Sequence, residues 1–360
     1  MGTTIGPLAG FQSCPLGVDA GYRSVALGVR MKQRFAALDG LRAVAAAGVL
    51  LYHVTDWSGR EGIVAHGYLA VDFFFCLSGF VLAHAFQRRD IGWLSYLWIR
   101  IVRIWPLLVL STLIGAALTA RHSPPVWLNL TRGLLLIPRL DPTPYGTFPS
   151  LFPFNPPAWS LFFEVLVSAL WFPVRRMPNA GLVTILIACF AVMLWGALGM
   201  HGIETGWDRA TFWIGLARST FSFTLGWLAW RSRGGAPAPR LVIPAVLLTA
   251  ALFAPIMPRN EIYDLACVTL LFPLLVSMGA HDPKGWVGAL CRRTGDISYP
   301  LYALHWAAWA VMMRVYARGE PAWFPLWFCG AALVFIPLVS WIASRFYDAP
   351  TRRWLSGLGR

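Results

Sequence analysis

The stretch "LDGLRAVAAAGVLLYHV", residues 38–54, is an apolar run of helical length that carries an arginine and a histidine. A helix of about 17 to 25 apolar residues crosses the hydrocarbon core of a bilayer. Ten such runs occur along the chain, at approximately 41–57, 68–86, 98–119, 157–174, 180–199, 210–230, 240–256, 262–279, 297–316 and 323–346. They predict an all-α fold, a polytopic transmembrane helical bundle of about ten spans.

The composition supports a membrane protein. Hydrophobic residues make up 57% of the 360 residues, charged residues make up 13%, and there are 19 tryptophans. A water-soluble domain of this size could not bury that much apolar surface. The apolar runs therefore face lipid as well as one another.

The net charge of +14 raises the question of a nucleic-acid partner. With the N-terminus placed in the cytoplasm, 20 of the 30 lysines and arginines fall in cytoplasmic segments, eight fall outside, and Arg42 and Arg218 lie within spans. This is the bias of the positive-inside rule. It predicts cytoplasmic N- and C-termini in the inner (plasma) membrane and explains most of the charge without nucleic acid.

The rest of the chain adds little domain structure. We expect residues 1–33 to be a disordered extension, 34–354 one transmembrane domain and 355–360 a short tail. The proline-rich connection 120–156 either carries function over a site or is a simple lid or tether between the third and fourth spans. The six cysteines are scattered singly, so no metal site is predicted.

Ionisable residues at membrane depth are costly, and they mark candidate functional sites. Eleven residues separate Arg42 from His53, which places both on one helix face about 16 Å apart along the axis. They mark two depths of one cavity, or else a snorkelling arginine and a hydrogen-bonded core histidine. The other deep residues of this kind are Asp72, His84, Glu164, Arg218 and His305, and Asp39 and Asp296 lie at cytoplasmic ends.

Asp72 and Glu164 are candidates for catalytic roles. Asp72 lies at the depth of His53, and a carboxylate beside a histidine makes it a usable base; alternatively it pins backbone groups. Glu164 lies near mid-membrane, where a carboxylate must be paired or protonated. Ser160 precedes it by four positions and therefore lies on the same helix face. Glu164 is either a proton-transfer group or a structural tie between helices.

Two more groups lie at the cytoplasmic side. Arg100 and Arg103 are one turn apart there, where two planar guanidinium groups suit phosphates, although arginines are common at this depth in any case. Further along, "GDISYPLYALHW" carries hydroxyls and His305 that line a passage or satisfy the backbone freed by its proline.

Six motifs in order resemble the acyltransferase 3 family of integral-membrane acyltransferases that modify bacterial sugars. They are "RFAALDGLRAVAAAGVLLYH" (34–53), "GYLAVDFFFCLSGFVL" (67–82), "RIVRIWP" (100–106), "AWSLFFEV" (158–165), "GDISYPLYALHW" (295–306) and "RFYDAPTRRW" (345–354). The chain has Ala43 where the family usually has glycine and Asp348 where it usually has glutamate. Neither difference removes a candidate catalytic group.

The resemblance implies transfer of an acyl group, acetyl by default, from cytosolic acyl-CoA to a hydroxyl of a glycan or glycosylated acceptor. Acyl-CoA is then a substrate, no tightly bound cofactor is expected, and the partners are acyl-CoA, the acceptor and membrane lipid. Arg42, Arg100 and Arg103 would hold the CoA phosphates. His53 would act as general base or transient acyl carrier, with Asp72 and Glu164 orienting it or relaying protons.

The same resemblance places four residues on the acceptor side, namely Ser160, Tyr299, Tyr302 and His305. Two other functions have to be weighed against an enzyme for a helical bundle that buries charges. A proton-coupled transporter or flippase also needs buried Arg, His and Glu residues, although the two halves of this chain show no internal repeat. A structural scaffold would have no reason to bury them.

Overall fold

The computed structural model describes residues 35–87, 89–119, 125–142, 149–200, 202–233, 241–256, 258–316 and 324–358. Within these residues the regular structure is helical, apart from one isolated bridge between Ser150 and Asp208. The expected all-α fold is thereby confirmed. The expected extension 1–33 lies outside the described residues.

The apolar runs become helices close to their predicted positions. The longer ones are α1 (Ala36–Trp57), α2 (Ala70–Phe86, preceded by the 3-10 turn Gly67–Leu69), α3 (Trp93–Thr119), α5 (Ala158–Val174), α6 (Asn179–Met200) and α7 (Phe212–Arg231). They are followed by α8 (Val242–Leu252), α9 (Asn260–Ala266), the π-helical turn Cys267–Leu271, α10 (Phe272–Met278) and α11 (Gly285–Tyr316). The last continuous helical segment consists of α12 (Leu326–Ala343), the π-helical turn Ser344–Asp348 and α13 (Ala349–Leu358).

Six of the continuous helical segments in the described residues are long and apolar enough to cross a membrane. They are Ala36–Trp57, Gly67–Phe86, Trp93–Thr119, Asn179–Gly199, Asn260–Met278 and Leu326–Leu358, and α5 and α8 are shorter apolar helices. The chain is thus a multi-pass membrane protein, while the total of ten spans and the cytoplasmic termini stay predictions. The expected tail from residue 355 begins inside α13, which continues to Leu358.

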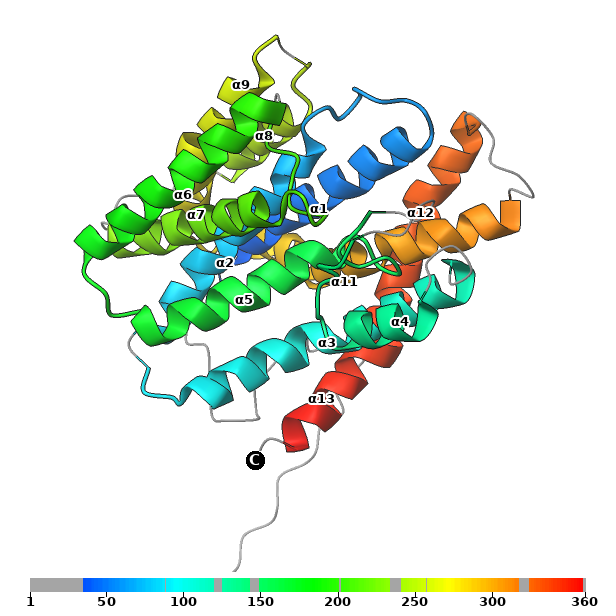
Figure 1. The fold of residues 1–360 in the computed structure, drawn as a ribbon, viewed down its shortest axis with the longest axis horizontal. Coiled ribbons are helices and arrows are strands. Elements are labelled where there is room, and N and C mark those ends of the chain that lie inside the picture. Colours follow the sequence, from blue (N-terminus) through cyan, green and yellow to red (C-terminus); the bar gives the residue numbers. More distant parts are fainter. Residues whose placement is uncertain are drawn as a thin grey trace, which may run out of the picture.

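The central helices are α1, α2, α7 and α11. Helix α2 packs most extensively against α7, and α1 against α11, while α3 and α12 flank α11 (Figure 1). A Cβ on Gly226 would lie 1.8 Å from the carbonyl oxygen of Cys76, so the α2–α7 crossing requires a residue without a side chain there. Large apolar side chains of the outer helices point outward, such as Trp195 of α6 at 72% exposed, as suits a lipid-facing surface.

One helix is missing from the sequence-based expectations. Residues Val126–Leu134 of the 120–156 connection form α4, which packs against α3 (Figure 1). The indole nitrogen of Trp105 in α3 donates to the carbonyl oxygen of Leu134 at 2.9 Å. Trp127 is 79% exposed on the other face. Part of this connection is therefore an amphipathic helix fixed to the bundle.

Candidate functional site

A pocket between α1, α2, α3, α5 and α11 collects most of the polar residues predicted from sequence. It encloses about 780 Å³, including the part that is open. Its polar lining consists of Arg42, Ser78, Arg100, Arg103, Ser160, Glu164, Ser298, Tyr299 and Tyr302. Its apolar walls include Phe74, Phe75, Val81, Leu82 and Ile104. Three guanidinium groups and one carboxylate thus face a largely apolar space.

Arg100 and Glu164 form a buried ion pair across the pocket, between α3 and α5. Only 3% of the Arg100 side chain is exposed, and Ser78 of α2 donates to the Glu164 carboxylate at 3.2 Å. The pair explains how a glutamate is tolerated at this depth. The Nε of Arg100 is buried without a hydrogen-bond partner in the described part of the chain, which leaves one donor for a ligand.

Arg42 is held by two residues of α11 and by its own helix. Its Nε donates to the Ser298 hydroxyl at 2.7 Å and its Nη2 to the Gly295 carbonyl oxygen at 2.7 Å. Asp39, one turn earlier on α1, lies 2.9 Å from the same Nη2. Arg42 is therefore oriented before any ligand binds.

Arg103 differs from Arg42 and Arg100 in its hydrogen bonds. Its side chain is exposed at the pocket, and no hydrogen bond or ion pair ties it to the residues that the structure describes. The sequence placed Arg100 and Arg103 one helical turn apart, and the structure gives them different surroundings. Arg103 retains a full set of donors, so an anionic ligand group can bind it directly.

Ser160 and Tyr302 close the pocket at one end. The two hydroxyls are 2.5 Å apart, and Phe74 packs edge-on against the Tyr302 ring with centroids at 5.5 Å. Tyr299 also lines the pocket, and its hydroxyl donates to the Ile104 carbonyl oxygen at 2.7 Å. These three residues therefore share one pocket with the arginines, whereas the resemblance had assigned them to a separate acceptor side.

His53 and His305 lie together just beyond this closed end. The His305 ring is 5.7 Å from that of Tyr302, and it stacks on His53 at 5.0 Å with an angle of 13°. Trp57 lies parallel to His53 at 4.8 Å. Neither His53 nor His305 lines the arginine pocket. The pocket that Arg42 lines thus does not include His53, in contrast to the single cavity expected from their shared helix face.

The hydrogen bond of His305 sets its tautomer. Its Nδ1 lies 2.6 Å from the Tyr302 carbonyl oxygen, which can only accept, so Nδ1 carries the hydrogen. In the neutral ring Nε2 is then an acceptor, and it is buried without a partner among the described residues. His53, half-buried, makes no hydrogen bond to them either. Two adjacent imidazoles therefore have nitrogens free for a substrate.

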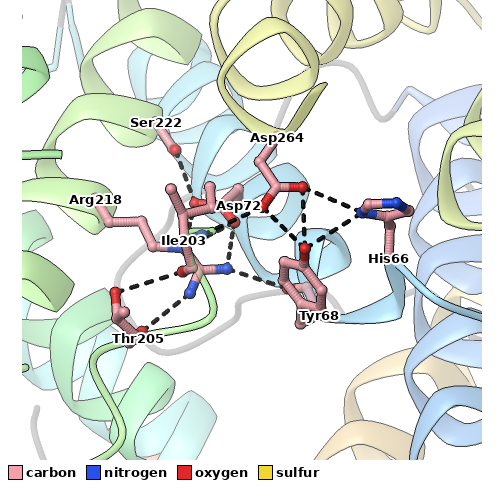
Figure 2. Close-up of polar contacts among 8 residues, drawn as sticks. All are labelled: His66, Tyr68, Asp72, Ile203, Thr205, Arg218, Ser222 and Asp264. Carbon is pink, nitrogen blue, oxygen red and sulfur yellow. Dashed lines mark hydrogen bonds and ion pairs between the residues drawn. The ribbon is translucent and has the colours of Figure 1, made fainter. Parts of the chain in front are cut away.

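The expected contact between Asp72 and His53 is not formed. Asp72 instead accepts two hydrogen bonds from Arg218 Nε, at 2.8 and 2.9 Å, and one from Nη2 at 2.5 Å (Figure 2). Both side chains are almost fully buried. A carboxylate buried at this depth binds the nearest cation, and α7 supplies it where α2 and α7 cross. Asp72 is part of a structural ion pair and does not orient the histidine.

The amino-acid pattern of the chain matches one family along most of its length. The match to the acyltransferase domain family Acyl_transf_3 covers residues 35–345. The chain belongs to the acyltransferase 3 family. It is therefore a membrane acyltransferase that transfers groups other than aminoacyl groups.

Two relatives give further comparisons for this acyltransferase. "Protein 2 in picA locus" of Rhizobium radiobacter is 34% identical over 183 residues, which are 45% of this chain and 93% of that protein. "Acyltransferase MdmB" of Streptomyces mycarofaciens is 32% identical over 165 residues, 40% of this chain and 41% of that protein. No solved structure matches the chain.

Several polar residues of the acyltransferase were not predicted from sequence. Asp264 lies within the apolar run 262–279, so the rule that flagged other charges at membrane depth applies to it as well. It accepts hydrogen bonds from Tyr68 and lies 3.1 Å from His66 Nδ1 (Figure 2). Glu204, between two spans, had no such signal. Its carboxylate accepts a hydrogen bond from the Tyr52 hydroxyl.

Proposed function

We propose that this acyltransferase moves an acyl group, acetyl by family default, from cytosolic acyl-CoA to a hydroxyl of a carbohydrate or glycosylated acceptor. The observation that carries the proposal is the arginine pocket next to the His53–His305 pair. It combines arginines, which can bind the phosphate groups of an acyl-CoA, with apolar walls, which suit its thioester end. We place the enzyme in the plasma membrane, in contact with lipid, with the pocket mouth on the cytoplasmic side.

The donor fits the pocket in its charge and its polarity. The CoA part carries diphosphate and phosphate groups, which bind arginines by charge-assisted hydrogen bonds. Arg42, Arg100 and Arg103 line the pocket, and Arg103 has all its donors available. The thioester end is less polar, and the apolar walls around Phe74 suit it. We assign Glu164 the role of holding Arg100 in place.

The histidine pair supplies the base. In direct transfer, His53 takes the proton of the acceptor hydroxyl while the hydroxyl oxygen attacks the thioester carbonyl carbon. The carbon–sulfur bond of the resulting tetrahedral intermediate breaks, an ester forms, and the proton on His53 passes to the CoA thiolate. Protons and electron pairs balance without a cofactor. Tyr302 lies next to both parts of the site, since it lines the pocket and its ring is 5.7 Å from that of His305.

The test is acyl transfer by the purified protein in liposomes with radiolabelled acetyl-CoA and a pool of glycans. We expect wild type to release CoA and label a glycan. The His53→Ala variant should lose transfer at least about a hundredfold, the scale of general-base catalysis, while it still binds acetyl-CoA. His84→Ala is a matched control, because His84 is a half-buried histidine of α2 that does not line the pocket. Full transfer by His53→Ala would refute the assignment.

A further inference from the structure

Glu204 is an exposed carboxylate between two buried residues. It belongs to the connection between α6 and α7, and its neighbours Ile203 and Thr205 are 1% and 2% exposed. A surface glutamate in a loop would ordinarily move freely. Here the backbone on both sides of Glu204 is fixed inside the protein, so its carboxylate is kept in one place.

The buried side chains of Asp264 and Arg218 hold the backbone on either side of Glu204 in place (Figure 2). The Ile203 amide donates to Asp264 at 3.2 Å, and Arg218 Nη1 donates to the Thr205 carbonyl oxygen at 3.0 Å. Arg218 is in turn held by Asp72. Each of the three side chains, Asp72, Arg218 and Asp264, is at most 1% exposed. Buried hydrogen bonds to charged groups are stronger than neutral ones, so the position of Glu204 is built into the bundle.

The carboxylate of Glu204 faces the helix that carries His53. It accepts a hydrogen bond from the hydroxyl of Tyr52, which precedes His53 on α1 and whose ring lies 5.1 Å from the imidazole. Trp57 stands one turn beyond His53 and stacks parallel to it. Tyr52, His53 and Trp57 are all half-buried, so they present part of their surface at this end of the bundle.

A second observation points to a ligand at the same place. The His305 ring is 6.0 Å from Trp57 and 5.0 Å from His53, with nearly parallel planes. Its Nε2 is an acceptor that is buried without a partner in the described part of the chain. An unsatisfied buried acceptor is destabilising, and a hydroxyl of a bound molecule would satisfy it.

We propose that Glu204, Tyr52 and Trp57 form the binding site for the acceptor, and that this acceptor is an uncharged sugar ring. The proposal rests on the proposed function and adds the place and the charge of its second substrate. A carboxylate accepts hydrogen bonds from two neighbouring hydroxyls, and an aromatic face packs on the C–H face of a pyranose. Next to it, His53 is placed to deprotonate one hydroxyl.

The charges around Glu204 exclude an anionic acceptor. Asp56 and Asp264 act on Glu204 by like-charge repulsion, whereas Arg218 and the Tyr52 hydroxyl stabilise its carboxylate. Arg218 is itself neutralised by Asp72. A uronic acid or a phosphate would therefore meet a negatively charged site, in contrast to the arginine pocket on the other side of Tyr302.

Saturation-transfer NMR on the purified protein, without any donor, tests this site. The probes are the methyl α-glycosides of glucose, galactose, mannose and rhamnose, together with methyl α-glucuronoside as the anionic probe. We expect wild type to bind at least one neutral glycoside and not the glucuronoside. Glu204→Ala should weaken that binding about ten- to hundredfold, as loss of a charge-assisted hydrogen bond does.

The control is Glu61→Ala, which removes an exposed carboxylate from the turn after α1 that makes no hydrogen bond to the described residues. It should bind the glycoside as wild type does. Equal binding by Glu204→Ala, binding of the glucuronoside, or no binding of any neutral glycoside by wild type would each overturn the proposal. Acetyl-CoA turnover is measured separately, so glycoside binding without turnover would reject the proposed function and keep the site.

Discussion

Replacing Asp72 tests whether this carboxylate holds the bundle together or takes part in catalysis. Arg218 donates three hydrogen bonds to Asp72 and one each to the Thr205 and Tyr68 carbonyl oxygens. Asp72→Asn removes the opposing charge and leaves a guanidinium that is 1% exposed. Removing one partner of a buried pair costs about 3–5 kcal/mol, because an uncompensated charge stays behind. We expect a loss of that size.

The assay is unfolding in mixed micelles with rising SDS, followed by tryptophan fluorescence. A double-mutant cycle with Arg218→Gln isolates the pair, and Asp72→Asn/Arg218→Gln should be more stable than the sum of the single losses predicts. The folded fraction of Asp72→Asn should keep most of its acyl transfer. A variant of Asp72 with unchanged stability and no transfer would refute this reasoning and restore the catalytic role suggested by the sequence.

Three further outcomes follow from the structure. Gly226→Ala should destabilise by about 1–3 kcal/mol in the same micelle assay because its Cβ meets a backbone oxygen, whereas Gly199→Ala, with no atom within 4 Å, should stay within about 1 kcal/mol of wild type. Arg100→Ala should cost about 3–5 kcal/mol because it leaves Glu164 without its cation, and adding Glu164→Gln should recover part of that loss. Although the Glu204 side chain is exposed in part, the protein around its carboxyl group desolvates that group, and Asp56 and Asp264 repel its charge, so its pKa is raised. Protonation therefore begins at a higher pH than for an ordinary glutamate. The KM for the acceptor should rise as pH falls through that pKa, and a flat profile in wild type would contradict this.

The fold was predictable because apolar length is a local property of the chain. The run that begins near residue 41 became α1 with an end at Trp57, as expected. In contrast, α4 was missed, since a nine-residue amphipathic helix in a proline-rich connection is neither long nor uniformly apolar.

The candidate site was predictable in its residues and less so in its pairings. Arg42, Arg100 and Glu164 line one pocket, although the sequence placed Glu164 nearer mid-membrane than the two arginines. The partner of Asp72 was wrong, because depth along a helix does not tell which neighbouring helix faces the residue. Arg218 is 146 positions away in sequence. The position of Glu204 could not be predicted from the sequence for the same reason, because buried residues of two other helices fix it.

The most direct test of the central claim is equilibrium binding of radiolabelled acetyl-CoA to the purified protein in liposomes. Arg103→Ala removes a guanidinium that has no partner in the described residues, so folding should be unaffected and affinity should fall about ten- to hundredfold. Arg176→Ala, an exposed arginine outside the pocket, should bind as wild type does. Unchanged affinity in Arg103→Ala, or an equal loss in both variants, would contradict the assignment of the arginine pocket to the donor.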